Sequence, residues 1–207
     1  HSITFYGYVN YTELKILDGA KCYAVNGTPA DCVKVALSLI LDSKPDMIIS
    51  GINKGFNLGS DVFYSGTVNA ALEGAVKGIK SIAVSQEYFL KDFEFTSEFV
   101  SKNLKKFYSL LPSDAQTIIN INVPSDDKNV IKGIKFSKVG VKRYVDTYTF
   151  ENNFGYKFKG SSELGDYNTK EDDVHLYEEN YITISAIKND WNDIETYEKL
   201  KDGDFNL

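Results

Sequence analysis

Apolar residues follow two different spacings through the first 124 residues of the chain. Three segments have the length and composition of buried strands, namely Met47–Ile49, Ser81–Ser85 and Thr117–Val123. Three other segments carry apolar residues at intervals of three and four, which is the helical period: 28–40, 68–75 and 95–111. Strands that alternate with helices in this way imply right-handed crossovers. The pattern therefore predicts an α/β fold with a Rossmann-like, mostly parallel sheet and flanking helices.

The first 31 residues add two predicted strands and a well-marked helix start. His1–Phe5 and Lys21–Val25 both have the composition of strands. Thr28 suits the N-cap position, Pro29 suits the first helical position, and Asp31 completes a capping-box pattern. We therefore expect a helix to begin at Pro29.

Beyond Pro124 the pattern changes from alternating strands and helices to mostly strands. The predicted elements are a strand at Val130–Val139, a β-hairpin from Tyr144 to Lys159 that turns at Asn152–Gly155, an acidic loop at Glu171–Asp173, a strand at Tyr181–Ile187 and a short helix at Ile194–Leu200. We expect one domain over residues 1–207, with an α/β core at 1–125 and a β-hairpin and C-terminal arm at 126–207. The aromatic hairpin suits either a partner subunit or a local core.

Composition limits the classes of ligand. The net charge of −6 disfavours a non-specific grip on a nucleic-acid polymer, so a small ligand fits better. No apolar run approaches the roughly 20 residues of a membrane span. The two cysteines, Cys22 and Cys32, make no disulfide framework and match no zinc pattern, which favours a reducing cytoplasm. Cys32 lies in the predicted helix and is expected to pack in the hydrophobic core.

A glycine-rich loop follows the strand at Met47–Ile49 and precedes the helix at 68–75. It carries glycines at 51, 55, 59 and 66, with asparagine, serine and threonine between them. In an open α/β sheet, ligands bind where such a loop leaves the strand, and the N–H groups at the start of the next helix suit a phosphate. The loop matches neither the P-loop nor the dinucleotide fingerprint. A capped helix after a plain surface loop is the alternative interpretation.

Several short motifs together resemble the survival protein SurE family. They are GTPADCV (27–33), SGINKG (50–55), NLG (57–59), YSGTV (64–68), ALEGA (71–75), IAVS (82–85), NINVP (120–124) and YITIS (181–185). Each motif is weak alone, but their order and spacing cover nearly the whole chain.

The resemblance implies a metal-dependent phosphatase that hydrolyses nucleoside monophosphates to nucleosides. It also implies one divalent ion, Mg²⁺ or Mn²⁺, and a homodimer or homotetramer whose hairpin and C-terminal arm exchange between subunits. The family's metal ligands are an aspartate pair, a serine and the asparagine of the Ser-Gly-hydrophobic-Asn motif. Only that asparagine, Asn53, matches here. The aspartate pair and the serine are expected upstream of His1, so no catalytic residue is assigned within this sequence.

The remaining loop residues have expected roles in binding phosphate and substrate. Asn57 and Gly59 are expected to shape the pocket and contact phosphate. Ser65, Gly66 and Thr67 are expected to start the helix and bind phosphate with the same geometry.

Charged residues near the loop and beyond it are expected to lie in solvent: Asp61, Asp126, Asp127, Lys142, Asp172 and Asp173. Two other functions stay open at this point. One is a non-catalytic nucleotide- or phosphate-binding module that uses the same loop. The other is a metal-free enzyme acting on sugar phosphates.

Overall fold

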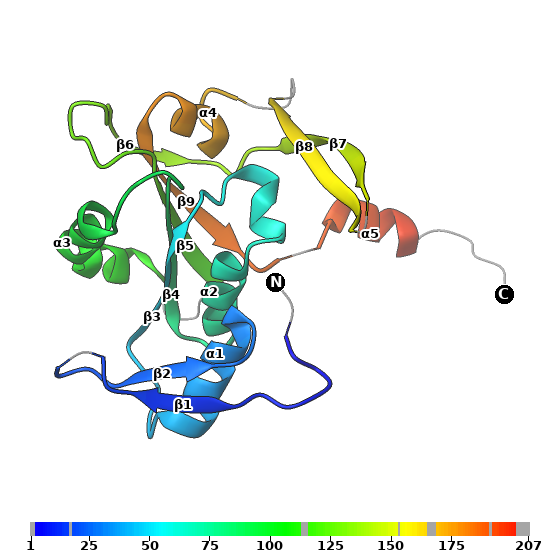
Figure 1. The fold of residues 1–207 in the computed structure, drawn as a ribbon. Helices are drawn as coiled ribbons and strands as arrows, with labels where there is room; N and C mark the ends of the chain where they lie inside the picture. Colours follow the sequence, from blue (N-terminus) through cyan, green and yellow to red (C-terminus); the bar gives the residue numbers. More distant parts are fainter. Residues whose placement is uncertain are drawn as a thin grey trace, which may run out of the picture.

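A mixed five-stranded sheet forms the centre of the computed structural model, which describes residues 3–16, 18–112, 116–152, 154–164, 169–190 and 192–201. The strands lie in the order β3 (Met47–Lys54), β4 (Lys80–Gln86), β5 (Thr117–Val123), β9 (Tyr181–Lys188) and β6 (Gly133–Ser137), as Figure 1 shows. Strands β3, β4 and β5 are parallel, β9 is antiparallel to β5, and β6 is parallel to β9. The predicted α/β class and mostly parallel sheet are confirmed. Strands from beyond residue 125 complete this sheet.

Helices cover both faces of the central sheet (Figure 1). On one face, α3 (Glu94–Leu110) packs Val100 and Phe107 against the sheet residues Val84 and Ile121. On the other face, α2 (Gly66–Val76) packs three small apolar residues against Ala83 and Ile118; they are Val68, Ala71 and Ala75. Strands covered on both faces need apolar residues on both sides, which explains Ile82–Val84 in β4 and Ile118, Ile119 and Ile121 in β5.

The N-terminal region differs from the prediction in one element. Residues Ile3–Phe5 lie in no strand, and β1 is instead Tyr11–Leu14. It pairs antiparallel with β2 (Cys22–Val25) in a separate two-stranded sheet, so the predicted strand at Lys21–Val25 is confirmed but lies outside the central sheet. Thr4 uses its N–H and hydroxyl to bind the carboxylate of Asp31, which removes this segment from strand pairing.

Helix α1 (Pro29–Val35) begins as predicted, with Thr28 as N-cap and a complete capping box. It continues as a π-helical turn, η1 (Ala36–Ile40), and packs against α2. Its buried residues are Ala30, Asp31 and Val35. The predicted core packing of Cys32 is wrong, because Cys32 faces away from that side of the helix and is exposed.

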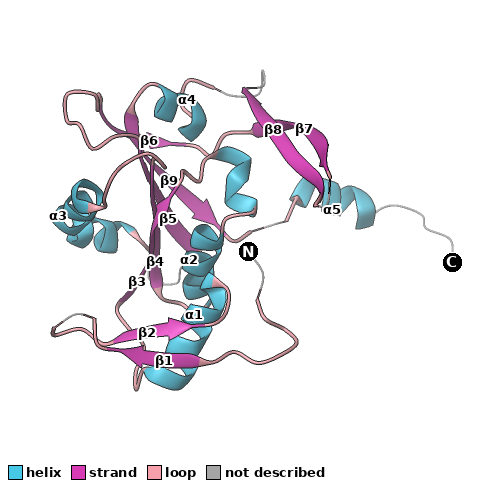
Figure 2. Cartoon of the chain, in the orientation of Figure 1, coloured by secondary structure: helices cyan, strands magenta, loops and turns pink. Residues whose placement is uncertain are grey.

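A long β-hairpin projects from the sheet (Figure 2). It consists of β7 (Lys142–Glu151) and β8 (Gly155–Leu164), which pair antiparallel with Tyr148 opposite Phe158. The predicted hairpin is confirmed, although Asn153 in its turn lies outside the described residues. The last helices are α4 (Asp173–Glu178), which contacts β9, and α5 (Ile194–Lys201), which buries no residue.

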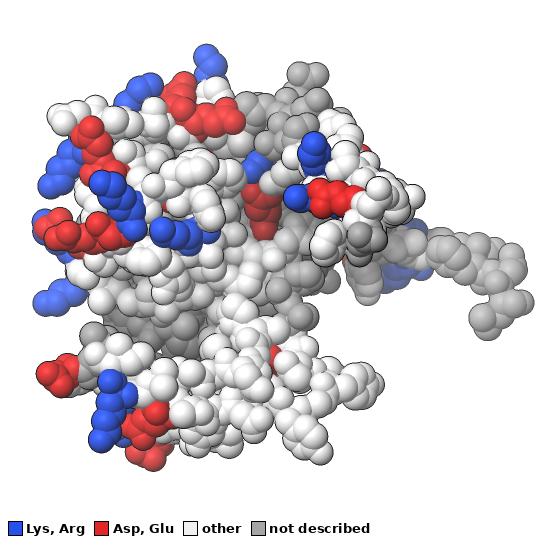
Figure 3. Space-filling view, viewed as in Figure 1, with Lys and Arg blue, Asp and Glu red and all other residues white. Residues whose placement is uncertain are grey.

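Charged side chains intermix on the surface. On the face in Figure 3, Lys and Arg lie beside Asp and Glu around α3, and a second, smaller mixed group of charges lies at the lower left of the view. Across the described residues, no helix combines the length and the apolar character needed to cross a membrane.

Candidate functional site

The loop after β3 leaves the carboxyl edge of the parallel strands, where ligands bind in open α/β sheets. The sequence predicts a strand over Met47–Ile49, but β3 runs on to Lys54 with a register shift between Ser50 and Asn53. Asn53 therefore sits at the last paired positions of β3, beside Ser85 of β4. Its Nδ2 donates to the carbonyl of Gly55 at 2.8 Å. This bond leaves Oδ1 as the side-chain atom that can meet a cation.

Asn57 is the most firmly held residue of the loop. Its N–H donates to Oδ1 of Asn122 at 2.7 Å, and its carbonyl accepts from Nδ2 of Asn120 at 2.9 Å and of Asn122 at 3.1 Å. Its own Nδ2 donates to Oγ of Ser85 at 2.7 Å. All four residues are buried. Strands β4 and β5 thus fix the loop, a role that sequence reasoning did not assign to Asn120 and Asn122. Their alternation within an otherwise apolar strand was the available signal.

Gly59 is held by a buried carboxylate. Its N–H donates to both oxygens of Asp173, at 3.1 and 3.2 Å, and the N–H of Gly140 donates to the same carboxylate at 2.8 Å. The φ of Gly59 is +52°, and a Cβ there would lie 2.9 Å from Cγ2 of Val174. Only glycine allows this close approach without strain. The loop, the segment before β7 and the start of α4 therefore meet at one point.

Asp172 and Asp173 are both buried, so their predicted place in a solvated loop is wrong. Asp172 is the N-cap of α4 and accepts from the N–H of His175 at 2.9 Å. Burial raises the pKa of Asp173 to about 6, against the opposing effect of the N–H groups of Gly140 and Gly59, and the neighbouring charge of Asp172 raises it further. Buried backbone N–H groups need acceptors, and these two carboxylates supply them. Asp126 and Asp127, in contrast, are exposed as predicted.

Helix α2 begins beside the loop with a capped N-terminus. Oγ of Ser65 accepts from the N–H of Val68 at 3.1 Å, which confirms that Ser65 is the N-cap. The helical bonding starts with the N–H of Asn69 donating to the carbonyl of Ser65 at 3.1 Å. The N–H groups of Gly66 and Thr67 precede this bond and point outward from the helix end, as N-terminal groups do. A Cβ at Gly66 would lie 2.9 Å from Cγ of Pro29, so glycine also lets α1 approach α2.

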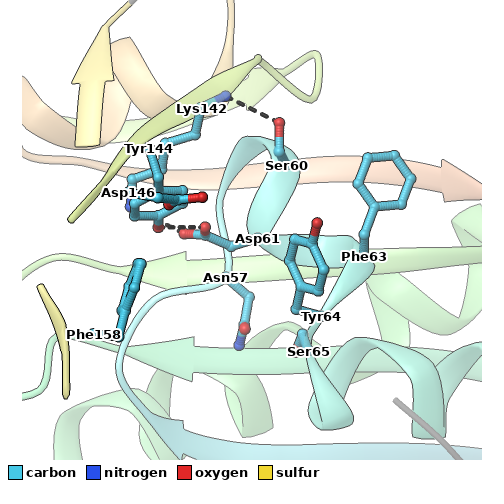
Figure 4. Close-up of a pocket in the computed structure, with 10 residues that line it drawn as sticks. All are labelled: Asn57, Ser60, Asp61, Phe63, Tyr64, Ser65, Lys142, Tyr144, Asp146 and Phe158. Carbon is cyan, nitrogen blue, oxygen red and sulfur yellow. Dashed lines mark hydrogen bonds and ion pairs between the residues drawn. The ribbon is translucent and has the colours of Figure 1, made fainter. Parts of the chain in front are cut away.

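A cavity of about 890 Å³ lies over this region (Figure 4). Its lining residues come from the loop, from η2 (Gly59–Phe63) and the residues after it, and from the hairpin: Asn57, Ser60, Asp61, Phe63, Tyr64, Ser65, Lys142, Tyr144, Asp146 and Phe158. The structure thus brings Asn57 and Ser65 together in one cavity wall. Asn53, Gly59, Gly66 and Thr67 are not among the lining residues.

An ion pair joins the hairpin to η2. Nζ of Lys142 lies 3.0 Å from Oδ2 of Asp61 and 4.1 Å from the centre of the Phe56 ring. The hydroxyl of Tyr144 donates to Oδ1 of Asp61, and the N–H of Lys142 donates to Oγ of Ser60 at 3.1 Å. Burial, with the Asp61 contact, raises the pKa of Tyr144 above its usual range.

The predicted solvation of Asp61 and Lys142 is therefore wrong. Their side chains are only 15% and 8% exposed, because the start of the hairpin folds back over η2. Asp61 does not present a bare negative charge to the cavity, since a cation and a hydroxyl neutralise it.

The described residues do not form a metal centre by themselves. They contain no group of three or more His, Cys, Asp or Glu side chains placed to hold an ion. Asn53 offers one neutral oxygen, which suits a hard divalent cation but needs carboxylate partners. Of the ligands that a divalent cation needs, these residues therefore supply one, the side-chain oxygen of Asn53.

Comparisons with known proteins agree on one family. The family model described as "Survival protein SurE" matches residues 1–146. The 5'-nucleotidase SurE of Natranaerobius thermophilus is 36% identical over 222 residues, which cover 99% of this chain and 82% of that protein. The 5'-nucleotidase SurE of Pelotomaculum thermopropionicum is 39% identical over 197 residues, which cover 93% and 73%. The crystal structure of the SurE protein from Aquifex aeolicus superposes with a TM-score of 0.79 at 32% identity, covering 97% of this chain and 82% of that one.

Proposed function

This chain belongs to the survival protein SurE family, and from that premise we propose that it is a phosphomonoesterase that hydrolyses nucleoside monophosphates to nucleoside and phosphate. The observation that carries the proposal is the match of 99% of the chain to a curated 5'-nucleotidase SurE. A non-catalytic phosphate-binding module is not favoured, because the relatives that match over most of the chain are named as nucleotidases.

The phosphate is held at the start of α2 in this proposal. The N–H groups of Gly66 and Thr67, with the Thr67 hydroxyl, donate to its oxygens, and the positive end of the helix dipole favours its charge. Ser65 keeps the helix end in place through its bond to Val68. These same donors stabilise the additional negative charge that develops in the transition state.

Asn57 and Gly59 shape the substrate cavity in this proposal. The N–H, carbonyl and Nδ2 of Asn57 and the N–H of Gly59 are all bonded to the protein. Their contribution is to hold the loop against β4, β5 and α4, so that the α2 end faces the cavity. Water near the reacting phosphate is then limited by the loop and the hairpin.

Oδ1 of Asn53 would hold one coordination position of a divalent ion, Mg²⁺ or Mn²⁺. The described residues contain no group of three or more His, Cys, Asp or Glu side chains to complete the coordination. Such an ion supplies charge neutralisation at the phosphoryl group and a water of lowered pKa. The residues of this chain bind the substrate phosphate and orient the substrate in the cavity.

The proposed assembly is a homodimer or homotetramer joined through the hairpin and the C-terminal arm. Exposed aromatic residues along β7 and β8 support this proposal. Cysteine usage supports a cytoplasmic location.

The experiment measures phosphate release from adenosine monophosphate by the full-length protein, with metal and substrate titrated independently. Chelator in excess should abolish turnover. Asn53→Ala should shift the metal dependence to higher concentration, because it removes one oxygen ligand. Thr67→Ala should weaken substrate binding about fivefold with the metal dependence unchanged, because a hydrogen bond is lost. Asn129→Ala, a change at an exposed turn, serves as the control.

Turnover that persists in chelator would refute the metal-dependent reaction. An Asn53→Ala variant with the parent's metal dependence would show that Asn53 has only a structural role at the end of β3.

A further inference from the structure

Aromatic rings from two separate elements line the cavity. Phe158 comes from β8, and Tyr64 directly follows η2. In Figure 4 their rings lie on opposite sides of Asn57. Phe158 is 51% exposed and Tyr64 is 72% exposed, so both residues present surface to the cavity that they line.

The charged residues on the hairpin side of the cavity argue against a second phosphate site there. Lys142 is the one basic residue among the described residues that line the cavity. Its ammonium group is 3.0 Å from Asp61 and its side chain is 8% exposed, so it is already neutralised and covered. Asp146 adds a carboxylate to the lining. A phosphate is therefore repelled from the hairpin end, whereas a neutral group is not.

The cavity is also larger than a phosphate group requires. Its volume of about 890 Å³ falls within the range of pockets that enclose whole small molecules. A planar heterocycle is the neutral group best suited to exposed aromatic rings. Stacking buries the surface of both the heterocycle and the side-chain ring, and it works for any nucleobase. A nucleoside monophosphate has a phosphate at one end and such a heterocycle at the other.

We propose that Phe158 and Tyr64 form a nucleobase subsite, in which the base of a nucleoside monophosphate stacks on these rings while its phosphate lies at the start of α2. This inference rests on the proposed nucleotidase function and adds the orientation of the substrate. The hairpin then determines preference for nucleotides over simpler phosphate esters.

The kinetic test compares two substrates that differ only in the base. The full-length protein is assayed with adenosine 5'-monophosphate and with ribose 5-phosphate. The ratio of the two kcat/KM values should fall about tenfold in Phe158→Ala and in Tyr64→Ala, with the loss in the KM for the nucleotide. Phe154→Ala is the matched control, because Phe154 is an 88% exposed ring on the same hairpin that does not line the cavity. Its ratio should equal the parent's.

A binding test needs no turnover and separates this inference from the proposed function. Adenosine, which has no phosphate, should bind the parent in calorimetry and bind Phe158→Ala about tenfold more weakly. Equal binding to parent and variants, or no binding to the parent, would overturn the subsite even if both esters are hydrolysed. Adenosine binding that is lost in the variants of a protein that hydrolyses neither ester would support the subsite and refute the nucleotidase.

Discussion

The two ends of the β7–β8 hairpin are held in contrasting ways. At its root, which we define as Lys142 and Tyr144, the buried ammonium group of Lys142 and the partly exposed hydroxyl of Tyr144 bind Asp61 of η2. At its tip, which we define as Phe150, Phe154 and Tyr156, the side chains are exposed, and two of them contact each other with ring centres 5.3 Å apart. At the root, charged groups contact each other within the chain. At the tip, aromatic side chains are exposed to solvent.

This difference separates two tasks within one element. A root bound by charges and backbone donors has one geometry, because each buried polar group must find its partner. The root can therefore place Phe158 and Asp146 at the cavity. Exposed aromatic side chains at the tip add little stability to the monomer, and such surface is typical of contacts with another protein surface. The same strands thus line the cavity at one end and, in the proposed assembly, would contact a partner subunit at the other.

The largest expected effect is the loss of the cation at the root. Lys142→Met should lower the free energy of unfolding by about 3 kcal/mol, because the carboxylate of Asp61 would stay largely buried without a positive partner. The double variant Asp61→Asn/Lys142→Met removes both charges and should recover at least half of that loss. Urea denaturation of the two single variants and the double variant measures the coupling.

The control for this cycle is an exposed ion pair in the same region. Nζ of Lys138 lies 3.1 Å from Glu171, with side chains that are 76% and 74% exposed. Lys138→Met should change the free energy of unfolding by less than about 0.5 kcal/mol, because solvent screens the pair. A Lys142→Met variant as stable as Lys138→Met would show that the root is not held by its charges.

The next effect is a pH dependence that Asp173 adds to stability. Its pKa is raised to about 6 from 3.8, so the folded protein holds this proton more tightly than the unfolded chain. The contribution to stability is complete below about pH 4 and is lost as the pH rises through 6. The loss is about 2 to 3 kcal/mol in total. Asp173→Asn cannot ionise, so its free energy of unfolding should fall less than the parent's between pH 4.5 and 7.5.

The measurement is the difference between the parent and variant curves, which cancels every contribution that the two proteins share. Asp193→Asn is the control. Hydrogen bonds from Thr196 lower the pKa of this exposed carboxyl, so it stays ionised across the range and its curve should parallel the parent's. Parallel curves for parent and Asp173→Asn would mean that the carboxylate is ionised throughout and only accepts hydrogen bonds.

Local patterns explain which parts of this fold sequence reasoning could reach. Strands β4 and β5 are buried on both faces, and their short segments rich in β-branched residues have few other interpretations. The capping box of Thr28 and Asp31 and the N-cap Ser65 lie within three residues of their partners. The Asn-Gly-rich turn of the hairpin is equally local. Interactions between residues this close in the sequence can be predicted from a single short segment.

The contacts that complete the site lie far apart in the sequence. Asp173 is 114 residues from Gly59, and Lys142 is 81 residues from Asp61. An aspartate in an acidic run is most often solvated, and only the fold shows that two backbone N–H groups need it. The strand predicted at His1–Phe5 is wrong in its described part for the same reason, since Thr4 binds Asp31, 27 residues away.

The smallest effect on the monomer is expected at the tip, and it decides between the two interpretations of the aromatic hairpin. The pair Phe150→Ser and Tyr156→Ser should lower the free energy of unfolding per chain by less than about 1 kcal/mol, because one exposed aromatic contact is lost. Light scattering should show a smaller molar mass for this double variant than for the parent, because an assembly surface has lost its apolar groups. Thr149→Ser and Lys157→Ser, made together on the same strands, control for changes in the hairpin itself. If stability instead falls by several kcal/mol while the mass is unchanged, the tip packs within its own chain and the contrast with the root disappears.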